Sequence, residues 1–244
     1  MRVYRGTLKL LDYVFFATIE RGKVYETGAF IHNYALAYAL GIARSDYAHL
    51  KQKPDYEKEL APLNAQGIYL TPAAPESPEK VTYRLVQWNA IQEGYAFAGK
   101  ERSIGYPDWG FARLLRPEST FTFYVLVAER AGLPKAPALK DALEGHSVRI
   151  RLGKFPGKAL ITLKSAEEIR EREGDFTVTS LLNWRDLPAD PVVCDVLAAS
   201  LPTRLVYNAH FTSARYYEVR FDGERIRLPR GMRFLARPLG GKKR

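Results

Sequence analysis

The chain of 244 residues contains one cysteine, Cys194, and four histidines. A lone cysteine excludes an internal disulfide and a cysteine-based metal site, and it favours a reducing cytoplasm. The histidines lack HxH or HxxxH spacing, so we expect no zinc or iron site and no cofactor. No apolar run approaches the ~18 residues of a membrane helix, and the first residues alternate as a strand rather than a signal peptide. We therefore expect a cytoplasmic protein with no membrane contact.

Several motifs of common enzymes are absent as well. The chain has no GxxxxGK[ST], GxGxxG or GxSxG sequence, which removes support for nucleotide-hydrolase, dinucleotide-binding and α/β-hydrolase functions. Asp186, Asp190 and Asp195 lie near Cys194, but acids in a turn more often form the turn than a catalytic set.

Acidic residues are missing from the last part of the chain. The net charge is +10, and residues 225–244 hold eight basic side chains and no acid, so the rest carries only about +2. Such an end could bind phosphates, or it could be a solvated terminus, with residues 238–244 as a basic flexible tail.

The periodicity of the remaining chain predicts many strands and few helices. Residues 3–10 alternate as a half-buried strand, extended structure continues to residue 18, and residues 30–40 read as a buried helix capped by Thr27 and ended by Gly41. Further strands are expected at 67–71, 81–88, 120–127, 176–182, 203–208, 215–221, 224–228 and 232–236, short helices at 56–60, 134–143 and 192–199, and a hairpin at 147–153 and 158–164. We expect an α+β fold: an RRM-like (ferredoxin-like) antiparallel sheet with helices on one face.

Two segments combine basic and aromatic side chains. Residues 89–118 show no clear period and carry Lys100, Arg102 and Trp109 between glycines, which indicates an excursion from the domain. The alternative is a surface flap whose aromatic side chains pack on the sheet, and it is slightly favoured for Trp109 and Phe111.

The second segment is the hairpin loop at residues 153–158. Its glycines would let a phosphate approach backbone N–H groups, Lys154 and Lys158 would neutralise it, and Phe155 offers a face for a base. An ordinary turn with solvated lysines explains the same residues equally well. His32, Tyr34 and Lys154 could in principle serve a metal-independent ribonuclease, but a hydrogen-bonded helix histidine explains His32 better.

A family resemblance spans the whole chain and is most distinctive in the first 45 residues. The FFAT and YET runs, the IHNYAL and YALG sequences of residues 31–36 and 38–41, and the later RIRLGKFPGKA hairpin resemble the fifth-family Cas subunit of type I-D CRISPR effector (Cascade) complexes. The resemblance implies one RAMP-type domain over residues 1–244 with a β-hairpin thumb inserted within 89–118. It also implies a non-catalytic role in antiviral defence, in which the subunit binds the 5′ handle of the CRISPR RNA.

The implied partners are the CRISPR RNA, the seventh-family backbone subunit, the tenth-family large subunit and target DNA. We expect RNA contacts from Arg44, Lys100, Arg102, Trp109, Arg149, Arg151, Lys154, Phe155, Lys158, His32 and Tyr34, and DNA or partner contacts from Arg230 and Arg233. The alternative functions are a repeat-processing endoribonuclease on the same fold and a basic scaffold protein that binds no RNA.

Overall fold

Strand β1 (Arg2–Leu10) lies inside an antiparallel sheet, here called the first sheet. A computed structural model describes residues 1–45, 54–90, 108–129, 136–155, 157–197 and 200–237. The order of the sheet is β4-β8-β1-β10-β9, and β5 pairs with β8. The bounds are β4 (Ile68–Leu70), β5 (Ala74–Pro75), β8 (Thr120–Val127), β9 (Val148–Leu152) and β10 (Gly157–Ser165).

One face of the first sheet forms the core. Leu8 and Leu10 are fully buried, whereas Lys9 between them is only half-buried, so the predicted alternation of β1 is confirmed. Gly6 lies under the ring of Phe123, where an added Cβ would come within 2.4 Å of the ring. The residue must therefore be glycine for Phe123 to cover the sheet.

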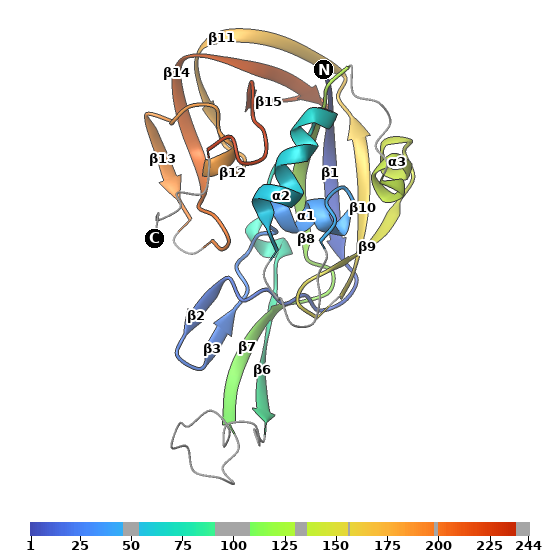
Figure 1. Cartoon of the computed structure of the whole chain (residues 1–244), viewed down its shortest axis with the longest axis vertical. Helices are drawn as coiled ribbons and strands as arrows, with labels where there is room; N and C mark the ends of the chain where they lie inside the picture. Colours follow the sequence, from blue (N-terminus) through green and yellow to red (C-terminus); the bar gives the residue numbers. More distant parts are fainter. Residues whose placement is uncertain (46–53, 91–107, 130–135, 156, 198–199, 238–244) are drawn as a thin grey trace.

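Short helices cover this face. Helix α1 (Asn33–Ala39) packs against β4 and β9, and α3 (Pro137–Leu143) packs against β9 and β10. Figure 1 shows α1 and α2 (Tyr56–Leu60) in front of the sheet and α3 beside β9. The 3-10 turns are η1 (Ala61–Gln66), η2 (Pro78–Lys80) and η4 (Trp184–Asp186). No helix in the described ranges is long and apolar enough to cross a membrane.

A second sheet is built around β14 (Leu205–Phe221), a strand of 17 residues. It pairs with β11 (Glu168–Val178), β12 (Leu182–Asn183), β13 (Val193–Val196) and β15 (Glu224–Pro229). Tyr124 of β8 and Phe221 of β14 lie with ring centroids 6.0 Å apart, so the two sheets pack against each other.

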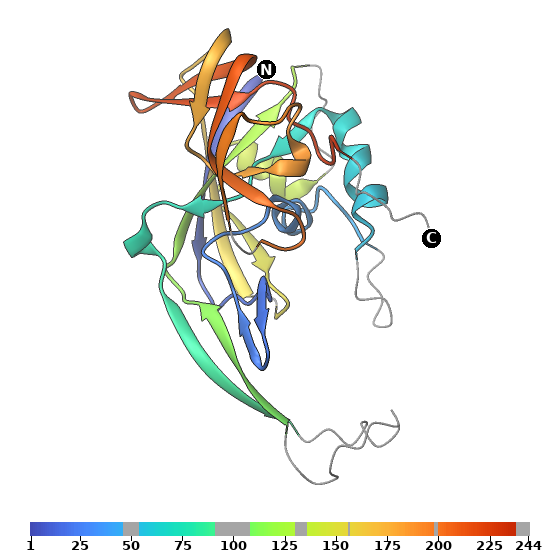
Figure 2. The same cartoon turned by 90° about the vertical axis from the view of Figure 1, so that its left-hand side faces the viewer.

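A third sheet projects from the body of the protein, as Figures 1 and 2 show. Its order is β2-β3-β7-β6, with β2 (Ile19–Arg21), β3 (Val24–Glu26), β6 (Tyr83–Ala90) and β7 (Asp108–Leu115). The long antiparallel hairpin of β6 and β7 forms most of the projection. Gly110 of β7 is required there, because an added Cβ would lie 2.5 Å from the Lys23 carbonyl oxygen and 2.6 Å from the Trp88 ring.

The structure confirms a protein of mixed strands and helices, with mostly antiparallel strands and few helices, and it corrects several element predictions. Residues 192–199 contain strand β13 rather than a helix, and the strands expected at 203–208 and 215–221 are the single strand β14. Residues 108–115 are a regular strand although we expected no period there. Residues 12–18 make only an isolated bridge at Val14, and residues 232–236 are not a strand.

Candidate nucleic-acid interface

The hairpin of β9 and β10 carries a basic surface, here called the hairpin patch: Arg149, Arg151, Lys154, Phe155 and Lys158. Val148–Leu152 alternates between exposed arginines and the buried Ile150 and Leu152. Lys158 of β10 lies directly opposite Arg151 in the strand register, so both side chains occupy the outer face. The sheet therefore brings these five predicted residues together.

Within the described part of the chain, no acidic side chain neutralises the charges of the hairpin patch. No described residue forms an ion pair with Arg149, Arg151, Lys154 or Lys158. Elsewhere on the same face the cations are paired: Lys9 with Glu118 at 2.5 Å, Arg5 with Glu224 at 2.8 Å, and Lys164 with Asp222. The patch is thus the part of this sheet face that offers unpaired positive charge to an anion.

The turn of this hairpin packs against residues 12–16, and this packing gives Gly157 a structural role. Lys154 N–H donates to the Phe15 carbonyl at 2.8 Å, and Lys158 N–H donates to Asp12 Oδ2 at 3.1 Å. An added Cβ at Gly157 would lie 2.5 Å from the Tyr13 carbonyl oxygen. Glycine is needed for this close approach, and the N–H groups of Lys154 and Lys158 have hydrogen-bond partners within the protein.

The side chains of the turn remain accessible. Phe155 is 68% exposed although its ring stacks on Phe15, with centroids 5.7 Å apart and planes 17° apart. Lys154 is exposed beside it. The turn therefore presents one aromatic face and one cation, held in place by its packing on residues 12–16.

His32 and Tyr34 lie in the core, which corrects their assignment as RNA contacts. His32 is 5% exposed and Tyr34 is 1% exposed. Burial lowers the pKa of His32 to about 3, and it raises the pKa of Tyr34. A side chain that solvent cannot reach does not contact RNA at the surface of this fold.

His32 has a structural role instead. Its Nδ1 accepts from Tyr34 N–H at 3.2 Å and so caps α1, and the prediction of Thr27 as the cap is wrong. Thr27 Oγ1 accepts from Phe16 N–H at 3.0 Å. Because Nδ1 is an acceptor, Nε2 carries the proton of the neutral ring, and Nε2 lies 2.8 Å from Thr203 Oγ1.

Thr203 leads into a buried polar network, here called the Asp186 network, which the sequence had not revealed. The Asp186 carboxylate accepts hydrogen bonds from five donors: Asn33 Nδ2 at 2.6 Å, Asn183 Nδ2 at 3.0 Å, Tyr34 O–H and Tyr69 O–H at 3.1 Å each, and Leu235 N–H at 2.9 Å. Thr203 O–H donates to Asn183 Oδ1 at 2.8 Å. The network joins α1 and β4 to η4 and residue 235, so it ties the first sheet to the C-terminal part of the chain.

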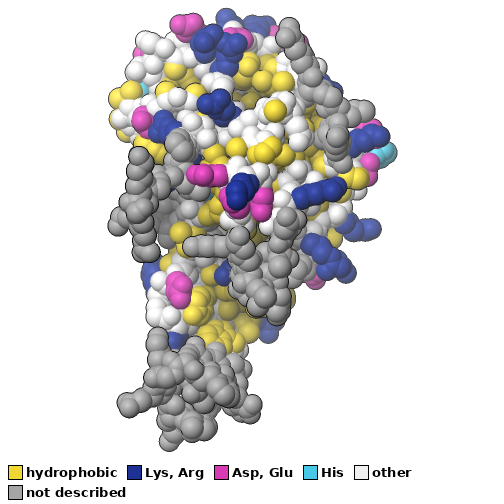
Figure 3. Space-filling view, viewed as in Figure 1, with side chains coloured by type: hydrophobic (Ala, Val, Ile, Leu, Met, Phe, Trp, Pro, Cys, Tyr) yellow, Lys and Arg dark blue, Asp and Glu magenta, His cyan; other side chains and the backbone are white. Residues whose placement is uncertain are grey.

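The other predicted residues lie apart from the hairpin patch. Arg44 is exposed beyond the end of α1, Arg230 pairs with Glu171 at 2.9 Å, and Arg233 is exposed near the C-terminal end of the described chain. Lys100 and Arg102 fall outside the described residues. In the view of Figure 3, Lys and Arg side chains lie in separate groups, with Asp and Glu beside the central one. The described Lys and Arg side chains thus do not form one continuous surface on this face.

Trp109 belongs to a separate set of stacked cations and rings on the third sheet. Lys23 Nζ lies 5.1 Å from the Trp109 ring centroid, and the Arg113 guanidinium lies 3.7 Å from that of Tyr83. Trp109 is still 45% exposed. Lys23 had no recognisable signal in the sequence, because it reaches this sheet through the parallel pairing of β3 with β7.

Among the described residues, no group of His, Cys, Asp and Glu side chains has an arrangement that would hold a metal ion. The features that these residues do offer are the cations and the aromatic face of the hairpin patch.

Comparison with solved structures gives remote similarities. A crystal structure of a CRISPR protein from Archaeoglobus fulgidus is 13% identical, with a TM-score of 0.42, and the match covers 94% of this chain and 100% of that chain. The cryo-EM structure of the type III-B Cmr-beta complex bound to cognate target RNA and AMPPnP is 12% identical, with a TM-score of 0.43, and the match covers 84% and 86%. No curated protein matches the chain.

A protein-family model identifies the chain more directly. The model described as type I-D CRISPR-associated protein Cas5/Csc1 matches residues 1–237, nearly the whole sequence. This agrees with the resemblance carried by the first 45 residues. The chain belongs to the type I-D Cas5/Csc1 family of CRISPR-associated proteins.

Proposed function

We propose that this protein is a non-catalytic subunit of a type I-D effector complex and binds the 5′ handle of the CRISPR RNA through the hairpin patch. Family membership supports a place in a CRISPR effector complex. The observation that carries the RNA contact is the set of exposed cations on β9 and β10 that have no ion pair among the described residues.

The chemistry of the hairpin patch suits a single-stranded RNA segment. Arg149 and Arg151 project from an edge strand, where they can bind phosphate oxygens without losing other partners. The exposed face of Phe155 can stack on an unpaired base, a contact that every base can make. Phosphate contacts would supply affinity and a steep salt dependence, and the stacked base would fix the register of the strand.

The order of the first sheet supports an RRM-like core for this function. Strands β4, β8, β1 and β10 have the order of a β-α-β-β-α-β unit, with α1 between β1 and β4 in sequence and α3 after β8. The edge strand β9 is an addition to that unit. In this arrangement the helices cover one face and the hairpin patch lies on the other, where RNA can reach it.

We also propose that the β6–β7 hairpin is the thumb, and that the protein contacts the backbone and large subunits and target DNA. The projection in Figure 2 supports a thumb, although its strands begin at Tyr83, before the predicted insertion. Leu85 is 59% exposed and Val86 is 38% exposed on this hairpin, so it offers apolar surface to a protein partner.

The absence of catalysis is part of this proposal. The ribonuclease alternative needs His32 and Tyr34 to reach a phosphodiester, and both are buried. Intact precursor RNA after long incubation with the wild-type protein in EDTA supports the proposal, and a discrete cut in the repeat overturns it.

Filter binding with a synthetic guide RNA tests the RNA contact. Arg149→Glu/Arg151→Glu is compared with Lys58→Glu/Lys140→Glu, which makes the same charge change on exposed residues of α2 and α3. The patch variant should bind the RNA at least about tenfold more weakly. The slope of log affinity against log salt concentration should also become shallower by about 2, since each phosphate contact contributes about 1. Equal affinity of the two variants would place the RNA elsewhere.

A further inference from the structure

The outer face of the second sheet carries five arginines, here called the arginine face: Arg170, Arg172, Arg220, Arg225 and Arg227. The register places them in neighbouring rows. Arg220 lies opposite Glu168 on one side and Arg225 on the other, and Glu218 lies between Arg170 and Arg227. Because side chains alternate along a strand, all of these groups share one face.

The acids near the arginine face neutralise only part of its charge. Arg220 pairs with Glu167 at 3.2 Å and with Glu168 at 3.7 Å, and Arg170 pairs with Glu168. Arg172, Arg225 and Arg227 are exposed and form no ion pair with a described residue. Counting Glu218, the described residues place three glutamates against five arginines, so this part of the structure carries excess positive charge.

An aromatic row leads from the arginine face into a pocket. The Arg227 guanidinium lies 6.0 Å from the Tyr216 ring centroid, Tyr216 stacks on Phe176 at 4.3 Å, and Phe176 stacks on Phe211 at 5.1 Å. The two phenylalanines are almost fully buried, so they form an apolar wall rather than a free stacking platform.

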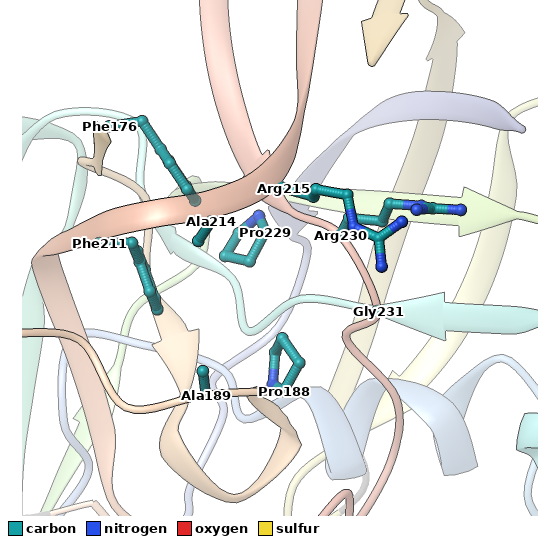
Figure 4. A pocket seen from close by; sticks show the side chains of 9 residues that line it. All are labelled: Phe176, Pro188, Ala189, Phe211, Ala214, Arg215, Pro229, Arg230 and Gly231. Atoms are coloured by element: carbon teal, nitrogen blue, oxygen red, sulfur yellow. The ribbon is translucent and has the colours of Figure 1, made fainter. Parts of the chain in front are cut away.

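The pocket has a volume of about 500 Å³, within the ~300–1,000 Å³ typical of small-ligand sites. Figure 4 shows Phe176, Phe211, Pro188 and Ala189 around it, with the side chains of Arg215 and Arg230 together at one side. Glu171 pairs with Arg230 at 2.9 Å. The pocket thus joins an apolar hollow to cations.

We propose that the arginine face and this pocket bind a single strand of nucleic acid, with its phosphates on the arginines and one nucleotide in the pocket. A planar guanidinium group can donate two parallel hydrogen bonds to two phosphate oxygens, whereas a lysine ammonium acts as a point charge. All five cations of the arginine face are arginines, which suits phosphate binding. An acidic protein segment would suit the arginines, but the apolar pocket that continues from them favours a strand with bases.

This surface is separate from the hairpin patch. Lys164 and Arg5 lie between the two, and they are neutralised by Asp222 and Glu224 at the β14–β15 turn. Lys164 is six residues from Lys158 along β10, a distance of about 20 Å at ~3.3 Å per residue. The two cationic surfaces are therefore divided by a neutral band.

Binding of labelled, unstructured 20-nucleotide RNA and DNA without a handle sequence tests the proposal on the full chain. Arg172→Glu/Arg227→Glu should weaken binding of one or both strands at least about tenfold, while handle RNA stays within about twofold of the wild type. Lys58→Glu/Lys140→Glu serves as the charge control. A preference for RNA identifies the strand as a continuation of the guide, and a preference for DNA identifies it as a target strand.

A second variant keeps the charge unchanged. Ala189 is exposed at the pocket, so Ala189→Trp should fill the pocket without disturbing the core. The variant should therefore weaken binding of the same strand that the arginine variant binds weakly. The proposal is overturned if the arginine variant binds both strands as tightly as the charge control does, or if polyglutamate competes as well as the strands do. It is also overturned if the arginine variant loses affinity for handle RNA to the same extent as for the strands. Failure of Arg149→Glu/Arg151→Glu to alter handle binding would refute the proposed function alone.

Discussion

Replacing Asp186 with asparagine should change how the stability of the protein depends on pH. The Asp186 side chain is fully buried and accepts five hydrogen bonds. Burial disfavours its charged form more than these hydrogen bonds favour it, and the pKa of Asp186 rises to about 7. An aspartate in an unfolded chain titrates near ~3.9.

The direction of the effect follows from proton counting. Between pH ~4 and ~7 the folded state holds one more proton than the unfolded state, so the free energy of unfolding falls as pH rises. A shift of about three units at ~1.4 kcal/mol per unit corresponds to about 4 kcal/mol, present below pH ~4 and lost as pH rises through 7. Asparagine exchanges no proton, so Asp186→Asn should lose this slope.

The variant should also be less stable at low pH. Asn33, Asn183 and Tyr69 all donate to one oxygen, and an amide offers only one acceptor atom in place of two. Each buried donor left without a partner costs ~1–3 kcal/mol.

Urea unfolding followed by tryptophan fluorescence from pH 5 to 8 measures both effects. Relative to the variant, the wild type should lose about 2 kcal/mol between pH 5 and 7, since Asp186 is only half-ionised at pH 7. Asp141→Asn makes the same change on the exposed surface of α3. Its plot of unfolding free energy against pH should run parallel to that of the wild type. Parallel curves for wild type and Asp186→Asn would refute this account of the Asp186 network.

Two further substitutions test the packing that positions the hairpin patch. Gly157→Ala should destabilise the protein by ~1–3 kcal/mol, because its Cβ would meet the Tyr13 carbonyl oxygen at 2.5 Å. Thermal unfolding measures this effect, with Lys158→Ala as the control. An unchanged melting temperature would contradict the close approach. Leu8→Ala should cost ~2–5 kcal/mol in chemical denaturation, because Leu8 is fully buried in the first sheet, and a cost below ~1 kcal/mol would disprove that position.

Elements whose burial alternates strictly could be predicted from the sequence. Strand β1 and the β9–β10 hairpin are half-exposed, so each side chain's polarity records the face it occupies. The hairpin patch followed from the same alternation, since Arg149 and Arg151 flank the buried Ile150.

Strand β14 shows where this approach fails. Asn208 and Ser213 have positive φ angles of 49° and 47°, and the register shifts opposite residues 174–176. These irregularities interrupt the inside–outside alternation of side chains, so the sequence of this one 17-residue strand reads as two separate strands. Residues 192–199 are a short, mostly apolar run that periodicity alone cannot assign to a helix or a strand, and the pairing of β13 with β14 decides between them.

The Asp186 network could not be predicted from local pattern. Asn33 is 153 positions from Asp186 and Tyr69 is 117 positions away, so no sequence window contains both partners. A partial signal was present: His32 and Asn33 are polar residues at the start of an apolar helix, and buried polar groups need hydrogen-bond partners. That signal predicts a partner without identifying it.

The Asp186 network connects stability to the proposed binding surfaces. It joins α1 and β4, next to the first sheet, to η4 and residue 235, next to the second sheet. The hairpin patch lies on the first sheet and the arginine face on the second. Two binding surfaces on one protein increase the affinity for a ligand that contacts both only when the distance between the surfaces matches the distance between the bound groups. The same holds for two strands of one complex. If both proposed surfaces bind as inferred, a buried network that fixes the packing of the two sheets would also set the separation of the two surfaces, without contributing any charge to either.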